Sequence, residues 1–217
     1  MSKPYLVISS PVDTYSGYGA RGRDFVKALI NLDKYDVKII PQRWGATPEF
    51  FLDDNEEWTY LKEFYIEKPD RQPDIWIQHT IPSEFQKVGK FNIGLTAGIE
   101  TTAARSEWVE GLNRMDLIIG SSNHTINSFN NSTYEKVDKR SNNVVGVVKP
   151  EVPMEVLFEG IDTEVYKIKK SKFNLNKVKE DFCFLFVGHW MQGNIGEDRK
   201  NVGLLVKGFL ELFKNNK

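Results

Sequence analysis

Three glycines near the N-terminus have the spacing of a phosphate-binding loop. Gly17, Gly19 and Gly22 form the pattern G-x-G-x-x-G, and a helical pattern follows them. Glycine lets a backbone approach a ligand closely, and the first turn of a helix offers unpaired N–H groups to an anion. The loop is therefore a candidate contact for a phosphate group.

The same pattern occurs in dinucleotide-binding proteins, but this sequence differs from them in two ways. In a dinucleotide site the first strand leads directly into the first glycine, whereas residues 11–16 separate the two here. That site also places a carboxylate at the end of the second strand, whereas residues 39–42 read IIPQ. An NAD-dependent oxidoreductase is therefore the least favoured of the functions considered.

Polar side chains near predicted strand ends are further candidates for chemistry. Glu100 would hold a ligand hydroxyl or act as a base, and the alternative is a loop or helix-capping carboxylate. His79 would contact a bound ligand, and the alternative is a buried histidine with satisfied hydrogen bonds. His79, His124 and His189 lack the spacing of metal ligands, so no metal site is predicted.

Hydrophobic patterns predict strands that alternate with helices. Strands are predicted at residues 5–10, 36–40, 74–78, 91–96, 116–121, 154–158 and 182–187, and helices at 21–32, 55–64, 106–115, 122–129 and 201–213. Residues 130–143 are polar and predict a loop or a frayed helix end. Strands joined by crossover helices pair in parallel. The expected fold class is therefore α/β, with a Rossmann-like doubly wound parallel sheet.

Aromatic residues are frequent in the segment between the second and third predicted strands. Trp44, Phe50 and Trp58 either pack in the core or form a platform for a sugar ring. Core packing is the favoured role for all three.

The pattern divides the chain into two domains joined by a basic linker. Residues 1–165 form the first Rossmann-like domain, and 166–180 form a lysine-rich linker that is either solvated or the rim of an anion-binding cleft. Residues 181–217 hold one strand and one helix. Such a unit cannot cover both faces of its strand. We therefore expect it to be the start of a second Rossmann-like domain that is cut short.

Composition excludes several classes of protein. The 217 residues are 40% hydrophobic and 27% charged, which excludes a collagenous, low-complexity or wholly disordered chain. Lys and Arg number 29 against 30 Asp and Glu, so no basic field exists to hold a nucleic acid. A single cysteine, Cys183, without a signal peptide or a long apolar run, predicts a cytoplasmic protein.

Several motifs occur together in an order that resembles one enzyme family. They are residues 16–25 (SGYGARGRDF), 74–82 (DIWIQHTIP), 96–102 (TAGIETT), 107–116 (EWVEGLNRMD), 118–122 (IIGSS), 159–166 (EGIDTEVY), 184–188 (FLFVG) and 199–201 (RKN). Their order and spacing resemble the family 4 glycosyltransferases of the GT-B class over nearly the whole chain. The first domain would then be a GT-B N-terminal domain.

The resemblance implies transfer of a sugar from a nucleotide-sugar donor, with retention of configuration and without a metal or another cofactor. The first domain of that family mainly holds the acceptor, which would be a sugar, a lipid or a polysaccharide, and the second mainly holds the nucleotide. By resemblance, Gly17, Gly19, His189, Arg199 and Lys200 contact the donor diphosphate. Cations and N–H groups there would stabilise the negative charge of the leaving group.

On the acceptor side, the resemblance implies contacts from Tyr18, His79 and Thr101, with Glu100 as the catalytic carboxylate. A membrane-surface acceptor is compatible with the resemblance, although no basic amphipathic helix argues for it.

The sequence also departs from the family pattern. His189 stands where arginine is common, and Glu159 stands where asparagine is common. Residues 190–198 form a longer segment than usual, and its two carboxylates, Glu197 and Asp198, would repel a diphosphate. Because the predicted second domain holds only one strand and one helix and so lacks most of the donor site, we expect this chain alone to have little or no transferase activity. The alternatives are half of a split transferase that needs a second chain, or a non-catalytic module that binds a carbohydrate or a protein partner.

Overall fold

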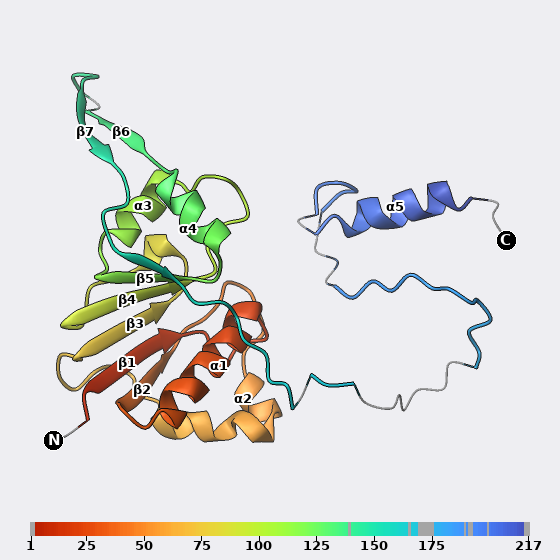
Figure 1. Cartoon of the computed structure of the whole chain (residues 1–217), viewed down its shortest axis with the longest axis horizontal. Helices are drawn as coiled ribbons and strands as arrows, with labels where there is room; N and C mark the ends of the chain where they lie inside the picture. The colour runs from red at the N-terminus through yellow and green to blue at the C-terminus, as the bar shows by residue number, and fades with distance from the viewer. Residues whose placement is uncertain are drawn as a thin grey trace. The chain divides into compact units, whose positions relative to one another are not determined.

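A computed structural model describes residues 3–138, 140–164, 166–168, 176–188, 190, 193–198 and 200–214 (Figure 1). The chain divides into two compact units, Met1–Asp162 (unit 1) and Thr163–Lys217 (unit 2). The division lies close to the domain boundary predicted at residue 165. Residue 165 itself and residues 169–175 of the predicted linker lie outside the described residues.

Unit 1 is built around a six-stranded sheet in which every pair of neighbouring strands is parallel. Its strands are β1 (Tyr5–Ser10), β2 (Asp36–Pro41), β3 (Ile75–His79), β4 (Phe91–Thr96), β5 (Leu117–Gly120) and β8 (Met154–Val156). Their order across the sheet is β2-β1-β3-β4-β5-β8. The predicted α/β class and parallel sheet are confirmed.

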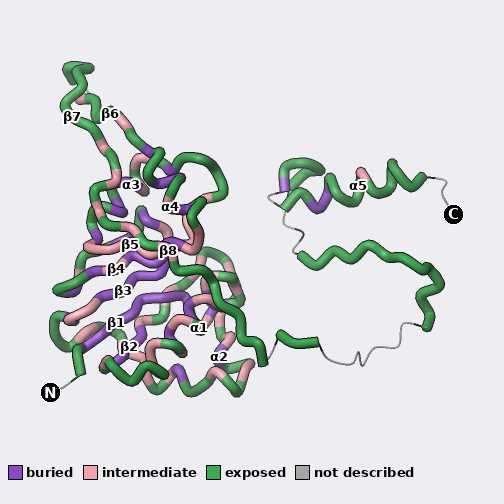
Figure 2. Tube along the Cα trace, in the orientation of Figure 1, coloured by how far each residue is buried: buried purple, intermediate pink, exposed green. Residues whose placement is uncertain are grey.

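Helices cover both faces of the sheet because its strands are apolar on both sides. One core cluster joins the sheet to α1 (Gly17–Asn31), α2 (Phe51–Asp54) and the 3₁₀ helix η1 (Glu56–Phe64). A second cluster joins the opposite face to α3 (Ser106–Leu112), α4 (Asn123–Asn130) and the residue after the 3₁₀ helix η2 (Pro82–Glu84). In Figure 2 the buried residues concentrate in the strands between these helices.

The loop or frayed helix end predicted at residues 130–143 is wrong for residues 134–137, which form the strand β6 (Tyr134–Val137). β6 pairs antiparallel with β7 (Val144–Val148), and this hairpin extends away from the sheet (Figure 1). Asp138 builds its turn, because the carboxylate accepts the N–H groups of Arg140 and Ser141. These hydrogen bonds lower the pKa of Asp138. A short polar side chain thus closes a hairpin that buries little apolar surface.

Unit 2 contains the predicted final helix, α5 (Val202–Leu212). The strand predicted at residues 182–187 is absent, since these residues belong to no helix or strand. Leu185 is 87% exposed and Phe184 is 66% exposed. The physical reason is that the described part of unit 2 contains no other strand with which this segment could pair.

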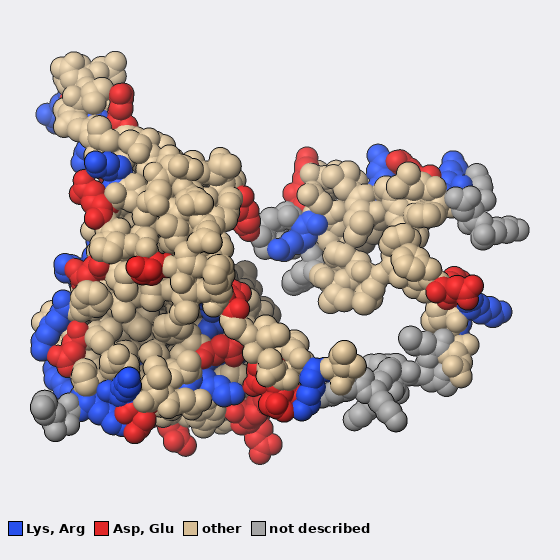
Figure 3. All heavy atoms as spheres, viewed as in Figure 1, with Lys and Arg blue, Asp and Glu red and all other residues tan. Residues whose placement is uncertain are grey.

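Two further features concern the charge of the visible face of unit 1 and the length of the helices. On the face of unit 1 drawn in Figure 3, acidic and basic side chains are interspersed, in keeping with the net charge of -1. None of the helices in the described ranges has the length and apolar character that crossing a bilayer requires.

Candidate functional site

The strand order of unit 1 marks one place on the sheet as a candidate ligand site. Successive strands are added on one side from β1 to β2 and on the other side from β3 onward, so the order reverses between β1 and β3. Sheets of this kind bind ligands outside the carboxyl ends of the strands at such a reversal. Ser10 ends β1 and His79 ends β3, so these two residues define the starting point of the site.

Ser10 and His79 are both completely buried and lie in contact. The Ser10 Oγ and His79 Nδ1 atoms are 3.1 Å apart, within hydrogen-bond distance. Gly22 of α1 makes this packing feasible. A Cβ atom at position 22 would lie 2.3 Å from Ser10 Oγ and 3.4 Å from His79 Nδ1. The last glycine of the G-x-G-x-x-G pattern therefore serves close packing of helix against strand.

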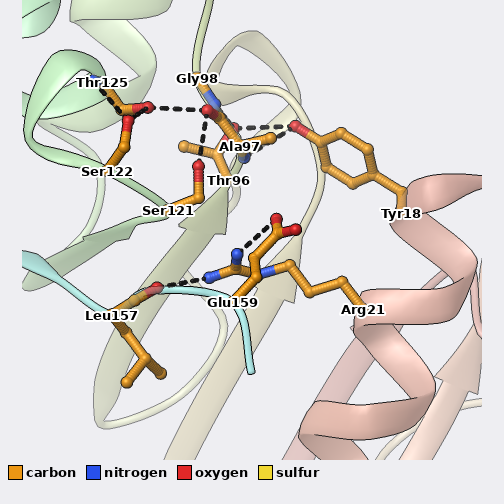
Figure 4. Close-up of polar contacts among 10 residues, drawn as sticks. All are labelled: Tyr18, Arg21, Thr96, Ala97, Gly98, Ser121, Ser122, Thr125, Leu157 and Glu159. Atoms are coloured by element: carbon orange, nitrogen blue, oxygen red, sulfur yellow. Dashed lines mark hydrogen bonds and ion pairs between the residues drawn. The ribbon is translucent and has the colours of Figure 1, made fainter. Parts of the chain in front are cut away.

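An aromatic stack lies over His79. The Tyr18 ring lies between the rings of Trp44 and His79, with centroid distances of 3.9 Å and 4.8 Å. The hydroxyl of Tyr18 is 3.1 Å from Thr96 Oγ1 and accepts the N–H of Ala97 at 3.0 Å (Figure 4). The first turn of α1 is thereby fixed to the end of β4.

Burial controls the electrostatics of this stack. It raises the pKa of the Tyr18 hydroxyl, and the nearby carboxylate of Glu100 adds a smaller increase. Burial also lowers the pKa of His79 to about 3, with a contribution from the positive charge of Arg21. His79 is therefore neutral at pH 7, and its Nε2 atom is buried without a hydrogen-bond partner. The ring can donate or accept one further hydrogen bond there, according to its tautomer.

Arg21 joins α1 to the segment that follows β8. Its Nη1 donates to Glu159 Oε1 at 2.6 Å and its Nη2 donates to the carbonyl of Leu157 at 3.0 Å (Figure 4). The Arg21 side chain is only 10% exposed, whereas that of Glu159 is 56% exposed. The Nε atom of Arg21 is buried without a partner. A nearly buried guanidinium is thus neutralised by a carboxylate that remains in contact with water.

Much of the glycine loop is engaged in contacts within unit 1. Ser16 caps α1, and its Oγ accepts the N–H of Gly19 at 2.8 Å. A Cβ atom at Gly19 would lie 2.3 Å from the carbonyl oxygen of Thr14, so this glycine also serves packing. The Gly19 N–H would reach an anion only if Ser16 released it. Gly17, in contrast, is exposed at the first position of α1.

Glu100 and Thr101 are exposed in the loop after β4, and Thr101 Oγ1 donates to the carbonyl of Ala103 at 2.9 Å. Of the three aromatic residues considered as a sugar platform, Trp44 alone belongs to the stack. The core role favoured from the sequence is confirmed for Trp58 and wrong for Phe50, which is 65% exposed just before α2.

The predicted diphosphate contacts of the second domain belong to unit 2. Lys200 is exposed just before α5, whereas His189 and Arg199 lie outside the described residues. The N-terminus of α5 is already occupied by Asp198, whose carboxylate accepts the N–H groups of Val202 at 2.9 Å and Gly203 at 3.2 Å. Asp198 thus takes the place that a phosphate would take at this helix end.

Sequence reasoning missed Ser10 and Arg21. Ser10 could have been found as the polar residue that ends a buried strand. Arg21 lies four residues after Gly17 and so on the same face of the helix, which was a usable signal. Its partners were not predictable, because Glu159 is 138 residues away in the sequence.

Within the described ranges, no group of three or more His, Cys, Asp or Glu side chains is placed to hold a metal ion. The site therefore consists of a neutral histidine, an aromatic stack, hydroxyl groups and one buried guanidinium.

No protein-family model matches this chain, and no curated protein or solved structure matches it either. The established result is the fold, an α/β unit with a six-stranded parallel sheet that is compatible with a Rossmann-like fold.

Proposed function

We propose that unit 1 is the acceptor-side lobe of a glycosyltransferase that uses a nucleotide-sugar donor, retains configuration and needs no metal. The observation that carries the proposal is the stack of Trp44, Tyr18 and His79 at the reversal point of the sheet. It agrees with the order of glycosyltransferase-like motifs in the sequence. We place the activity in the cytoplasm, since the single cysteine indicates a reducing compartment.

The chemistry of the stack suits a sugar. A sugar hydroxyl both donates and accepts, so it is best met by neutral groups with the same capacity. His79 is such a group, because burial keeps it uncharged at pH 7. Thr101 provides a hydroxyl in the loop after β4, and Glu100 provides the carboxylate. In this proposal Tyr18 and Thr101 contact the acceptor, His79 does so once the Tyr18 ring that covers it moves aside, and Glu100 orients or deprotonates the acceptor hydroxyl.

The proposal assigns contacts with the donor diphosphate to the N-terminus of α1 and, by the sequence resemblance, to side chains of unit 2. Gly17 is exposed at that helix end, and its N–H would contact a diphosphate oxygen. Lys200 would supply a positive charge, together with the arginine and histidine predicted beside it. Because Asp198 occupies the N-terminus of α5, stabilisation of the leaving group would depend on these side chains.

The proposal also requires that further α/β structure cover the apolar side chains of unit 2. Residues 182–187 and α5 expose large apolar side chains, and a nucleotide-binding lobe would need them covered. We therefore expect little or no turnover of nucleotide sugars by the 217-residue chain alone, and activity when a complementary half is supplied.

A second candidate function is a carbohydrate-binding module without catalysis. Two observations favour it: unit 1 has its own complete core, and Asp198 occupies the helix end at which the predicted nucleotide site begins. Such a module would bind sugars through the stack without needing a nucleotide.

Thermal unfolding of the full chain separates these functions. A ligand that binds only the folded state raises the melting temperature. The transferase proposal expects UDP, GDP or ADP to raise it, and the binding module expects free sugars alone to do so. Stabilisation by NAD alone would favour the oxidoreductase. If none of these ligands shifts the melting temperature, the proposal is wrong.

A further inference from the structure

A groove of about 520 Å³ lies beside the site, between α1 and residues 157–162. All of its lining residues belong to unit 1, and its size is within the range of small-molecule sites. Small residues keep it open: Gly17, Ala20 and Ala28 line the side formed by α1, and Gly160 lines the other. A Cβ atom added at Gly17 or Gly160 would meet nothing within 4 Å.

Charged groups in the groove are of both signs. Two cations of α1, Arg21 and Lys27, pair with Glu159 and Asp162 of the opposite side, with closest N–O distances of 2.6 Å and 3.6 Å. Asp24 adds a third carboxylate, and burial raises its pKa. Carboxylates therefore outnumber cations, which disfavours an anionic occupant.

The two ion pairs also hold the segment in place. Its apolar side chains do not anchor it, because Leu157 is 47% exposed and Phe158 is 66% exposed. The Lys27–Asp162 pair is well exposed on both sides and contributes little free energy. The Arg21–Glu159 pair is costlier to break, because the Arg21 side chain is nearly buried.

We propose that this groove binds a neutral polyhydroxylated ligand, a sugar residue of the acceptor. Sugar hydroxyls would donate to Asp24 and accept from Arg21 or Lys27, and the apolar faces of the ring would lie against Phe25 and Phe158. Each of these residues lines the groove. The inference rests on the proposed sugar-binding function, and it places a sugar subsite where the sequence motifs assign none.

The test uses the full chain, with methyl pyranosides of glucose, mannose and galactose as neutral probes and inorganic pyrophosphate as the anionic probe. Saturation-transfer NMR measures binding of the pyranosides, and line broadening in the phosphorus NMR spectrum measures binding of pyrophosphate. We expect at least one pyranoside to bind and pyrophosphate not to bind in the groove. Asp24→Asn should weaken pyranoside binding at least about tenfold, the size of one charged hydrogen bond.

Two tryptophan variants locate the binding. Ala28→Trp fills the groove from an exposed helical position and should abolish pyranoside binding, whereas Asn127→Trp, at an exposed position of α4, should leave it unchanged. Unchanged circular dichroism confirms that both variants fold. The inference is overturned if no pyranoside binds, if binding survives Ala28→Trp, or if only pyrophosphate binds and Ala28→Trp removes it.

The sugar-binding test of the groove and the nucleotide test of the transferase proposal can succeed or fail independently. Groove binding of pyranosides without any effect of nucleoside diphosphates supports the subsite and contradicts the transferase. Stabilisation by nucleoside diphosphates with no pyranoside in the groove supports the transferase and contradicts the subsite.

Discussion

Units 1 and 2 each contain an apolar segment with the composition of a strand. The segment in unit 1 is buried, and the segment in unit 2 is exposed. Tyr5–Ser10 is buried along its whole length, because β2 and β3 flank it and helices cover both faces of the sheet. Residues 182–187 are equally apolar but exposed. Their described aromatic contacts are with α5 and with each other: Phe184 lies 5.7 Å from Phe209 and 5.8 Å from Phe213, measured between ring centroids.

The difference shows what an apolar pattern specifies. It indicates that a segment has to be buried, but the burial itself depends on neighbouring strands and on a layer over each face. Unit 1 supplies all of these from its own residues, whereas the described part of unit 2 supplies one helix.

The two units should differ most in how much stability is lost when an apolar side chain is truncated to alanine. Leu95 of β4 is 0% exposed, so Leu95→Ala should lower the free energy of unfolding by about 2–5 kcal/mol. Leu210 of α5 is 64% exposed, so Leu210→Ala should change it by less than about 0.5 kcal/mol. Urea unfolding followed by circular dichroism measures both. Equal losses would mean that Leu210 is as well buried in solution as Leu95.

Acid should destabilise unit 1 through His79. Its folded pKa is about 3, below the ordinary value of 6.5. Between these values the unfolded chain binds a proton that the folded chain does not, so stability falls as the pH falls below about 6.5. The loss should approach about 1.4 kcal/mol for each pH unit.

Urea unfolding between pH 6.5 and pH 4.5, a range that lies between the two pKa values, tests this slope. His79→Gln should remove the histidine contribution whatever its effect on overall stability. His124→Gln, at an exposed position of α4, is the matched control and should keep the slope of the unaltered chain. An unchanged slope in His79→Gln would show that His79 is not held neutral in the folded state.

The sequence allowed the parallel sheet to be predicted because its strands are short apolar runs with clear ends. In the hairpin, β6 was missed because its residues are mostly polar and exposed, whereas the valine-rich run of β7 was a usable strand signal. The site was only partly predictable. Tyr18 and His79 were candidates, but their stacking joins residues far apart in the sequence, as do the contacts of Arg21. Contacts between residues so far apart in the sequence are set by the order of the strands in the sheet, which the local sequence pattern does not specify.

The smallest expected effect is on the local stability of α5, where Asp198 binds the N-terminus of the helix. Asp198→Ala removes the carboxylate that accepts two N–H groups, so it should cost about 1 kcal/mol of local helix stability. Hydrogen exchange at Val202 and Gly203 should then be roughly fivefold faster. Exchange in β1 and β3 should not change, because those strands belong to unit 1.

Glu197→Gln is the control, since Glu197 is exposed and bonds Asn194 instead of the helix end. Unchanged exchange in Asp198→Ala would mean that the N–H groups of α5 are not held by Asp198. They would then be open to a phosphate, and the helix end would return as a contact for the donor diphosphate. Faster exchange, as expected, means that an anion at this end must first displace Asp198, which leaves side chains such as Lys200 to carry that role.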